Sequence, residues 1–191
     1  AFDPLAPKNS GRDRVIWSAG HNTPLLYSLL ALVYESLQRS GRRFDKEAIN
    51  AVLAKDLLNF RSINGLAGHA ENYYPLSDYG TGPSGHGLSA GAGMAMSHKG
   101  SGLSTKVYVI MGDNETAEGM SYEARNLSAE LGLDNLIVSV DRNHFGIDGS
   151  LDEVMESGYV NHWLGLGWNV IEIDGHDISQ CLEAYKTAAE G

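Results

Sequence analysis

The sequence predicts an α/β fold with a doubly wound, mostly parallel sheet flanked by helices, and two observations support this fold class. The stretch 106–149 reads as strand, helix and strand, because apolar runs at 107–111 and 136–140 enclose a helical pattern over 117–131. Such a crossover joins two parallel strands with a right-handed connection. A further predicted strand at 168–173, followed by a final helix, repeats the alternation and favours helices on both faces of the sheet.

The elements before this central unit follow from apolar periodicity and from capping signals. A short strand is expected at 15–17, and a helix is expected over 23–37 because its Thr-Pro start is typical of a helix N-terminus. This helix is apolar on most sides, so we expect it to be buried in the core or against a partner chain. A second, amphipathic helix is predicted over 44–53, with Phe44 as a hydrophobic staple.

Two glycine-containing segments follow. The coil expected over 61–79 is long for a compact domain, which indicates a functional loop. The glycine-rich loop, residues 80–85, formally matches GxGxxG, but no strand precedes it and Pro83 interrupts it, which argues against dinucleotide binding. Its glycines allow a ligand to approach the backbone closely. The helix predicted over 88–98 is rich in Ala, Gly and Ser, so a neighbouring element is expected to pack very near it.

Two helices are predicted to bury one apolar face each. The members of these faces recur at three- and four-residue intervals. In the central helix they are Met120, Ala124, Leu127 and Leu131, and in the final helix Ile178, Leu182, Tyr185 and Ala188. Asp177 is expected to cap the final helix, with Gln180 at the capping-box position.

The composition limits the function classes. A chain of 191 residues with 42% hydrophobic residues can form one domain with a sizeable core. The net charge of −10 disfavours nucleic acid or an anionic membrane as a partner. The single cysteine, Cys181, cannot form an internal disulfide, which fits a cytoplasmic location. The sequence shows no signal-peptide pattern and no apolar run long enough to span a membrane.

The chemistry is expected where the two central strands end. Asp113 follows the first strand and Asn143 follows the second, and parallel strands end at the same edge, so the two residues should lie side by side. Carboxylate, amide and carbonyl oxygens suit Mg²⁺ or Ca²⁺, and Mg²⁺ often completes its coordination with phosphate oxygens. A helix opening after Asp113 would point free N–H groups at that phosphate. A solvent-facing Asp and a turn-forming Asn are the alternative interpretation of the same residues.

Six phrases of the sequence together resemble the transketolase family. They occur in the family's order through nearly the whole chain: SAGH, GHAENYYP, TGPSGHGLSAGAGMAM, GDNETAEG, DRNHFGIDG and GWNVIEIDGHD. The resemblance implies the thiamine-diphosphate-binding fold, with residues 1–191 forming a single diphosphate-binding domain. It also implies that the chain is incomplete at both ends relative to the family's first domain and carries no pyrimidine-binding domain.

By this resemblance, the metal ligands are the side chains of Asp113 and Asn143 and the backbone carbonyl of Phe145. The residues expected to bind thiamine diphosphate are His21, Gly82, Ser84, Gly112, Asp113, Asn114, Asn143 and Ile147. Asn114 departs from the family's GDG phrase, but it retains an N–H that could reach a phosphate oxygen and tolerates unusual φ angles.

The same resemblance assigns catalytic roles to His21, His69 and Glu118. His21 is expected on the diphosphate and substrate side, and His69 is expected to bind substrate hydroxyls or to move protons. Glu118 matches a carboxylate near the contact between subunits, although an acidic residue in a first helical turn is also favoured by the helix dipole. Ser84 and His86 replace a Leu and a Gln of the family phrase and make the expected pocket more polar.

The expected function is that of the N-terminal subunit of a transketolase-like enzyme. Such an enzyme transfers a two-carbon ketol unit from a ketose to an aldehyde acceptor. The activating glutamate must then come from a C-terminal, transketolase-like subunit with a pyrimidine-binding domain, in a homo- or hetero-oligomer. The alternatives are a deoxyxylulose-phosphate synthase-like enzyme, a 2-oxo acid dehydrogenase-like enzyme, or a non-catalytic paralogue that only binds a partner.

Overall fold

The sheet at the centre of the fold contains three parallel strands, seen in a computed structural model that describes residues 2–147, 149–154 and 159–190. The strands are β1 (Arg14–Trp17), β2 (Val107–Gly112) and β3 (Leu136–Asp141), with β2 in the middle. Both neighbours pair with β2 in parallel. These strands confirm the three predictions made for this part of the chain, and their carboxyl ends lie at one edge, referred to below as the carboxyl edge.

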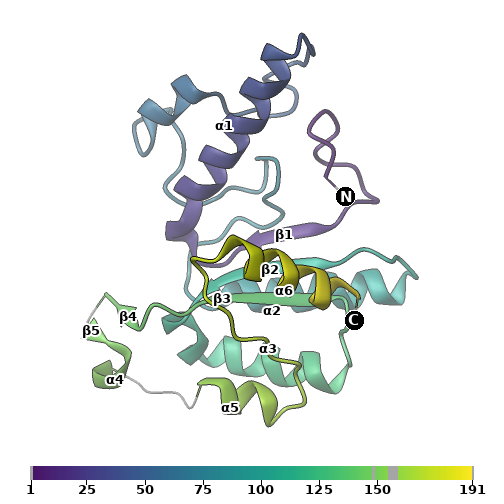
Figure 1. Ribbon diagram of the computed structural model, residues 1–191, viewed down its shortest axis with the longest axis vertical. Helices are drawn as coiled ribbons and strands as arrows, with labels where there is room; N and C mark the ends of the chain where they lie inside the picture. Colours follow the sequence, from purple (N-terminus) through teal and green to yellow (C-terminus); the bar gives the residue numbers. More distant parts are fainter. Residues whose placement is uncertain (1, 148, 155–158, 191) are drawn as a thin grey trace.

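Helices cover both faces of this sheet, as the doubly wound prediction requires (Figure 1). On one face lie α1 (Thr23–Arg39) and α6 (Ile178–Glu190). On the other face lie α2 (His86–Gly100) and α3 (Gly119–Glu130), which contact each other along their length. In Figure 1, α6 crosses in front of the strands, while α1 extends away from β1.

The alternation of side chains along β1 and β2 divides the core into two clusters. Val15, Trp17 and Ile110 point to the face of α1, where they pack around the fully buried Leu26 and Leu30 in what we call the α1 cluster. The opposite cluster, the α2 cluster, is formed by the alternate strand residues and by α2 and α3; it contains Ile16, Val107, Val109, Met111, Leu88, Ala92, Ala95 and Ala124. Period-two burial in the strands therefore places an apolar layer on each side of one sheet.

Close packing of α2 on the sheet is confirmed at two glycines. A Cβ placed at Gly91 would lie 2.5 Å from Cγ2 of Val109 in the central strand. A Cβ placed at Gly87 would lie 2.3 Å from Cβ of Ser18, directly after β1. The small residues of the predicted helix thus bring its axis close to the strands.

Short elements connect this framework. Three 3₁₀ helices are η1 (Gly20–Asn22), η2 (Ala54–Asn59) and η3 (Asn114–Ala117). Beyond the carboxyl edge, a small antiparallel pair is formed by β4 (Phe145–Gly146) and β5 (Gly149–Ser150). Two short helices, α4 (Leu151–Val154) and α5 (Tyr159–Leu164), lie between this pair and α6 in the chain.

The helix predicted over 44–53 is wrong, and the structure has turns there instead. The Asp45 carboxylate accepts hydrogen bonds from the amides of Glu47 and Ala48, as at a helix start. Asn50 then adopts a positive φ of 49°, which ends the helical geometry after about one turn. The apolar residues of this segment are still buried: Val52 and Leu53 join the α1 cluster.

The strand predicted over 168–173 is also wrong, because none of these residues is in a strand. Trp168 and Val170 pack against the α2 cluster, and Ile171 and Ile173 remain 47% and 40% exposed. The segment pairs with no described strand; instead, Trp168 donates to the carbonyl of Arg125 in α3 at 3.2 Å, and Glu172 pairs with Arg142 after β3. The final helix after it is confirmed, and the Asp177 carboxylate caps it by accepting bonds from the amides of Ser179 and Gln180.

Three helices expose apolar residues that the sequence predicts to be buried. On α1, one side is buried and the other carries Leu25, Leu29 and Leu32 at 63%, 41% and 72% exposure. On α3, only Ala124 of the predicted face is buried, because Ser121, Arg125 and Ser128 face the core. On α6, no described residue is buried. Across the described residues, no helix combines the length and the apolar character needed to cross a membrane.

Candidate cofactor-binding site

The carboxyl edge brings Asp113 next to the loop that carries Asn143. Asp113 follows β2 directly and is only 2% exposed. Its Oδ2 accepts a hydrogen bond from the amide of His144 at 2.7 Å, and its own amide donates to the carbonyl of Asp141 at 3.1 Å. The juxtaposition expected from the parallel strands is therefore present.

The loop after β3 is held in a tight turn. The Asn143 side chain is exposed, and its Oδ1 accepts a bond from the amide of Phe145 at 2.9 Å. His144 has a positive φ of 65°, which is uncommon for a residue with a side chain. The carbonyl of His144 accepts a bond from the amide of Leu151 at 3.0 Å. The turn thus orients the Asn143–Phe145 backbone around the Asp113 carboxylate.

The oxygens at this edge fit a hard divalent cation. The carboxylate of Asp113 and the amide oxygen of Asn143 each accept backbone N–H groups and retain further lone pairs for a metal. Among the described residues there is no group of three or more His, Cys, Asp or Glu side chains that could hold a metal. A cation at this edge would therefore depend on one carboxylate together with amide and carbonyl oxygens, such as those of Asn143 and Phe145.

The N–H groups after β2 do not point freely outward, contrary to expectation. The amide of Gly112 donates to Oε1 of Glu115 at 2.7 Å, and the amide of Asn114 donates to Oδ1 of Asp113 at 2.7 Å. Helix α3 begins only at Gly119, after η3, so its N-terminus does not directly follow Asp113. A phosphate at this edge could use the Asn114 amide only by displacing the Asp113 oxygen from it.

Asn114 also contacts the loop on the other side of the site. A Cβ placed at Gly146 would lie 2.8 Å from Nδ2 of Asn114. Asn114, which replaces the second glycine of the family's GDG phrase, is exposed, and its side chain lies against Gly146 in β4. It connects the segment after β2 with the segment after β3.

Both predicted histidines lie at the same edge. His21, in η1, places its Cε1 3.8 Å from where a Cβ on Gly112 would be, so its ring faces the end of β2. The ring of His69 lies against Gly20, with Cγ 2.9 Å from a Cβ placed there. Both side chains are exposed. The long coil predicted over 61–79 thus brings His69 next to the segment that carries His21.

The glycine-rich loop borders the site on its other side. The hydroxyl of Thr81 donates to the carbonyl of Trp17 at 2.8 Å, which fixes the start of the loop to the end of β1. Gly82 and Ser84 are exposed. At the end of the loop, Gly85 has a positive φ of 80°, and a Cβ there would lie 2.7 Å from Cβ of Glu118. The loop therefore bridges the end of β1 and the segment before α3.

Three other predicted residues lie around this centre. Ile147 is completely exposed, and Phe145 is 70% exposed. His86 is the first residue of α2 and is half-buried. Ile147 belongs to neither core cluster of the described residues.

The residue that the sequence reasoning missed is Glu115. It is 5% exposed, and its carboxylate contacts Ser18, Gly85 and Gly112, all at the carboxyl edge. One signal was available: an acidic residue three positions after a glycine at a strand end can accept the unpaired backbone N–H there.

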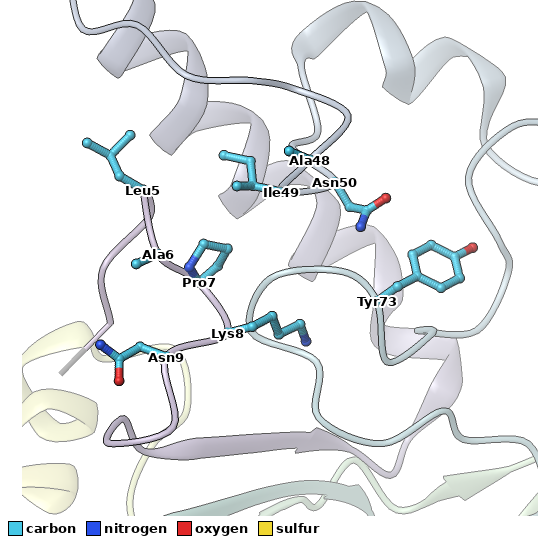
Figure 2. Close-up of a pocket in the computed structure, with 9 residues that line it drawn as sticks. All are labelled: Leu5, Ala6, Pro7, Lys8, Asn9, Ala48, Ile49, Asn50 and Tyr73. Atoms are coloured by element: carbon cyan, nitrogen blue, oxygen red, sulfur yellow. The ribbon is translucent and has the colours of Figure 1, made fainter.

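A separate pocket lies away from the carboxyl edge. It has a volume of about 230 Å³ and is lined by the N-terminal segment and the turn at 48–50 together with Tyr73 (Figure 2). Lys8 extends from the N-terminal segment, and its amine donates to the carbonyls of Asn72 and Ser77 at 2.7 Å each. Burial lowers the pKa of Lys8. This lysine stabilises the coil at 61–79, and none of the predicted site residues lines the pocket.

Comparison with known proteins places this geometry in a family. The whole chain, residues 1–191, matches the model of the transketolase thiamine diphosphate binding domain. One subunit of the apulose-4-phosphate transketolase from Phocaeicola vulgatus is 35% identical, over 96% of this chain and 60% of its own length. Transketolase 1 of Aliivibrio fischeri is 36% identical, over 96% of this chain and 28% of its own.

Solved structures agree with these sequence relatives. The transketolase of Campylobacter jejuni superposes with a TM-score of 0.84 at 31% identity, covering 100% of this chain and 29% of that one. The transketolase of Pichia stipitis in complex with sedoheptulose-7-phosphate gives a TM-score of 0.85 at 30% identity, covering 99% and 28%. The chain therefore spans 60% or less of the length of each of these relatives. It belongs to the transketolase family, and it matches the thiamine diphosphate binding domain of that family.

Proposed function

We propose that this chain is the thiamine-diphosphate- and Mg²⁺-binding N-terminal subunit of a transketolase-like enzyme. The enzyme would transfer a two-carbon ketol unit from a ketose to an aldehyde acceptor. The observation that carries the proposal is the contact between the Asp113 carboxylate and the amide of His144, because it joins the ends of two parallel strands into one oxygen-rich site.

Different residues at the carboxyl edge would bind the cation and the cofactor. Asp113, Asn143 and the carbonyl of Phe145 would hold the cation, with Ca²⁺ as a substitute for Mg²⁺. Gly112 and Asn114, which flank Asp113 in the chain, would lie against the diphosphate. The exposed Gly82 and Ser84 and the exposed Ile147 would contact the cofactor's rings. The chemistry supplied when thiamine diphosphate is bound is an electron sink for cleavage of the bond beside the ketose carbonyl.

The catalytic side chains would act on the substrate rather than on the cation. The ring of His69 lies against Gly20, the residue before His21, and both histidine side chains are exposed at the same edge. An imidazole there can hydrogen-bond substrate hydroxyls or transfer a proton to or from the substrate. Glu118, beside Gly85, would face a partner chain.

Activity would require a second chain. We propose that residues 1–191 form a single diphosphate-binding domain and that a C-terminal subunit with a pyrimidine-binding domain supplies the activating glutamate. A relative that covers nearly the whole of this chain is named as one subunit of a transketolase, which supports a two-subunit arrangement. The relatives compared above are named transketolases, which favours ketol transfer over the other thiamine-dependent reactions and over a non-catalytic role.

Calorimetric titration with thiamine diphosphate and Mg²⁺ tests the binding part of the proposal. The wild-type chain should bind the cofactor only when Mg²⁺ is present, and Asp113→Asn should abolish this binding because it removes the only carboxylate ligand. Asp134→Asn is the matched control, since Asp134 is exposed and lies at the opposite end of β3. Equal affinity of the wild type and Asp113→Asn, with both folded, would eliminate the metal assignment.

Reconstitution tests the partner part. The chain alone should show no ketol transfer from a ketose phosphate to an aldehyde. Addition of a chain that carries the pyrimidine-binding domain, with Mg²⁺ and thiamine diphosphate, should restore turnover. Robust turnover by this chain alone would contradict the two-subunit proposal.

A further inference from the structure

Glu115 lies buried where three segments of the carboxyl edge meet. Its Oε1 accepts a hydrogen bond from the amide of Gly112 at 2.7 Å, at the end of β2. Its Oε2 accepts one from the hydroxyl of Ser18 at 2.6 Å and one from the amide of Gly85 at 2.9 Å. A single carboxylate thus connects the end of β2 with the segment after β1 and with the end of the glycine-rich loop.

Dipolar donors, and not a cation, hold this carboxylate. None of the ion pairs found among the described residues includes Glu115. A buried carboxylate loses its hydration, and it is stable only where donors replace the water. Hydrogen bonds to a charged acceptor are stronger than those between neutral groups. The three donors are therefore fixed relative to one another.

The two oxygens of Glu115 have different reach. The bond to Gly112 is local, because it spans three positions. The bonds from Oε2 span 97 positions to Ser18 and 30 positions to Gly85. Ser18 is in turn held from its other side by Gly87, where no Cβ would fit. Oε1 thus anchors the side chain to β2, and Oε2 fixes the glycine-rich loop against the strand ends.

We propose that Glu115 is a positioning residue that sets the glycine-rich loop at the separation from Asp113 that thiamine diphosphate requires. This inference rests on the proposed function, since the ligand must reach both the strand ends and the exposed Gly82 and Ser84. Loss of the Oε2 bonds weakens the binding of a ligand that contacts both the strand ends and the glycine-rich loop. A ligand that contacts only the strand ends is not affected.

Glu115→Gln separates the two oxygens. In the orientation that leaves the amide oxygen of the glutamine on Gly112, its NH₂ group faces the amide of Gly85, donor against donor. Affinity for thiamine diphosphate with Mg²⁺ should fall about tenfold, the effect of one lost charge-assisted bond. Affinity for inorganic pyrophosphate with Mg²⁺ should stay within about twofold of wild type. Glu123→Gln, the same charge change on the exposed side of α3, should alter neither.

Amide hydrogen exchange, followed by NMR without ligand, tests the connection itself. In Glu115→Gln the amide of Gly85 should exchange faster, while the amide of Gly112 keeps its protection. Unchanged protection at Gly85 would overturn the inference whatever the ligand data show. Equal weakening of both ligands, or of neither, would overturn the positioning role.

Two controls keep the outcomes separate. If the wild type binds neither thiamine diphosphate nor pyrophosphate, both the proposed function and the positioning role are wrong. Exchange at the amide of Gly85 still shows whether Glu115 connects the glycine-rich loop to the strand ends. If circular dichroism shows that Glu115→Gln is unfolded, Ser18→Ala replaces it. That variant removes one of the two Oε2 donors, so it should show the same ligand pattern with a smaller loss, about threefold.

Discussion

Two glycines of α2 offer a matched test of how closely this helix packs on the sheet. A Cβ at Gly91 would lie 2.5 Å from Cγ2 of Val109, which is completely buried in the central strand. A Cβ at Gly93 would meet no heavy atom of the described residues within 4 Å, and Gly93 is exposed. Both positions lie inside one helix, so replacement by Ala brings the same gain in helix propensity, about 1 kcal/mol.

The packing term separates the two variants. Forcing a methyl group against Val109 costs about 1–3 kcal/mol, because the surrounding core cannot expand without strain. Gly91→Ala should therefore range from neutral to about 2 kcal/mol less stable than wild type, while Gly93→Ala should gain up to about 1 kcal/mol. For a chain of this size, each kcal/mol corresponds to about 2–4 °C in Tm.

Urea unfolding followed by circular dichroism measures this difference. The two variants should share the wild-type slope and differ in midpoint, with Gly93→Ala above wild type and Gly91→Ala at or below it. Equal stabilisation by both substitutions would refute the close approach of α2 to β2.

Three further predictions concern the core, a buried ion pair and pH. Leu26→Ala should cost about 2–5 kcal/mol in urea unfolding because the side chain is fully buried, whereas Leu25→Ala, at 63% exposure, should change stability by less than about 0.5 kcal/mol; equal losses would contradict the orientation of α1. Asp78→Asn should cost about 3–5 kcal/mol, measured by thermal unfolding, because it leaves the buried guanidinium of Arg12 without its carboxylate; a loss below about 1 kcal/mol would show that this pair is not needed. Burial, with a smaller effect from a nearby arginine, lowers the pKa of His98. The unfolded chain then binds the proton more readily, so this contribution to stability is present above about pH 6.5 and is lost as the pH falls through the folded pKa. In His98→Asn, unfolding measured from pH 7.5 to pH 5 should lack that part of the decline, and an unchanged pH dependence would refute the assignment.

The sequence predicts the framework well where local pattern and burial agree. The runs at 107–111 and 136–140 are strands whose β-branched residues are buried or half-buried in the sheet. The Thr-Pro start correctly predicts α1, and parallel pairing correctly brings Asp113 to the loop of Asn143. These features depend on neighbours in sequence or on one crossover rule, so they can be read without coordinates.

Other features depend on tertiary contacts that the pattern does not encode. The apolar spacing of 44–53 resembles that of a helix, but the positive φ of Asn50 ends the helical geometry. The turns that form instead still bury Val52 and Leu53. The alternation of 168–173 resembles a strand, yet the segment pairs with no described strand, and Trp168 bonds to a carbonyl of α3 instead. On α3 the polar Ser121, Arg125 and Ser128 face inward, and the hydroxyl of Ser121 donates to the carbonyl of Glu115. Glu115 was missed because two of its three donors are distant in sequence.

The most direct measurement of the central claim is the position of the cation. Crystals grown with thiamine diphosphate and Mn²⁺ in place of Mg²⁺ would locate the metal by its anomalous signal. The account predicts one peak at the carboxyl edge, roughly 2 Å from an Asp113 carboxylate oxygen and from the Asn143 amide oxygen, with the carbonyl of Phe145 and the diphosphate completing its ligands. A peak elsewhere, or a diphosphate bound away from Asp113 and Asn143, would contradict it.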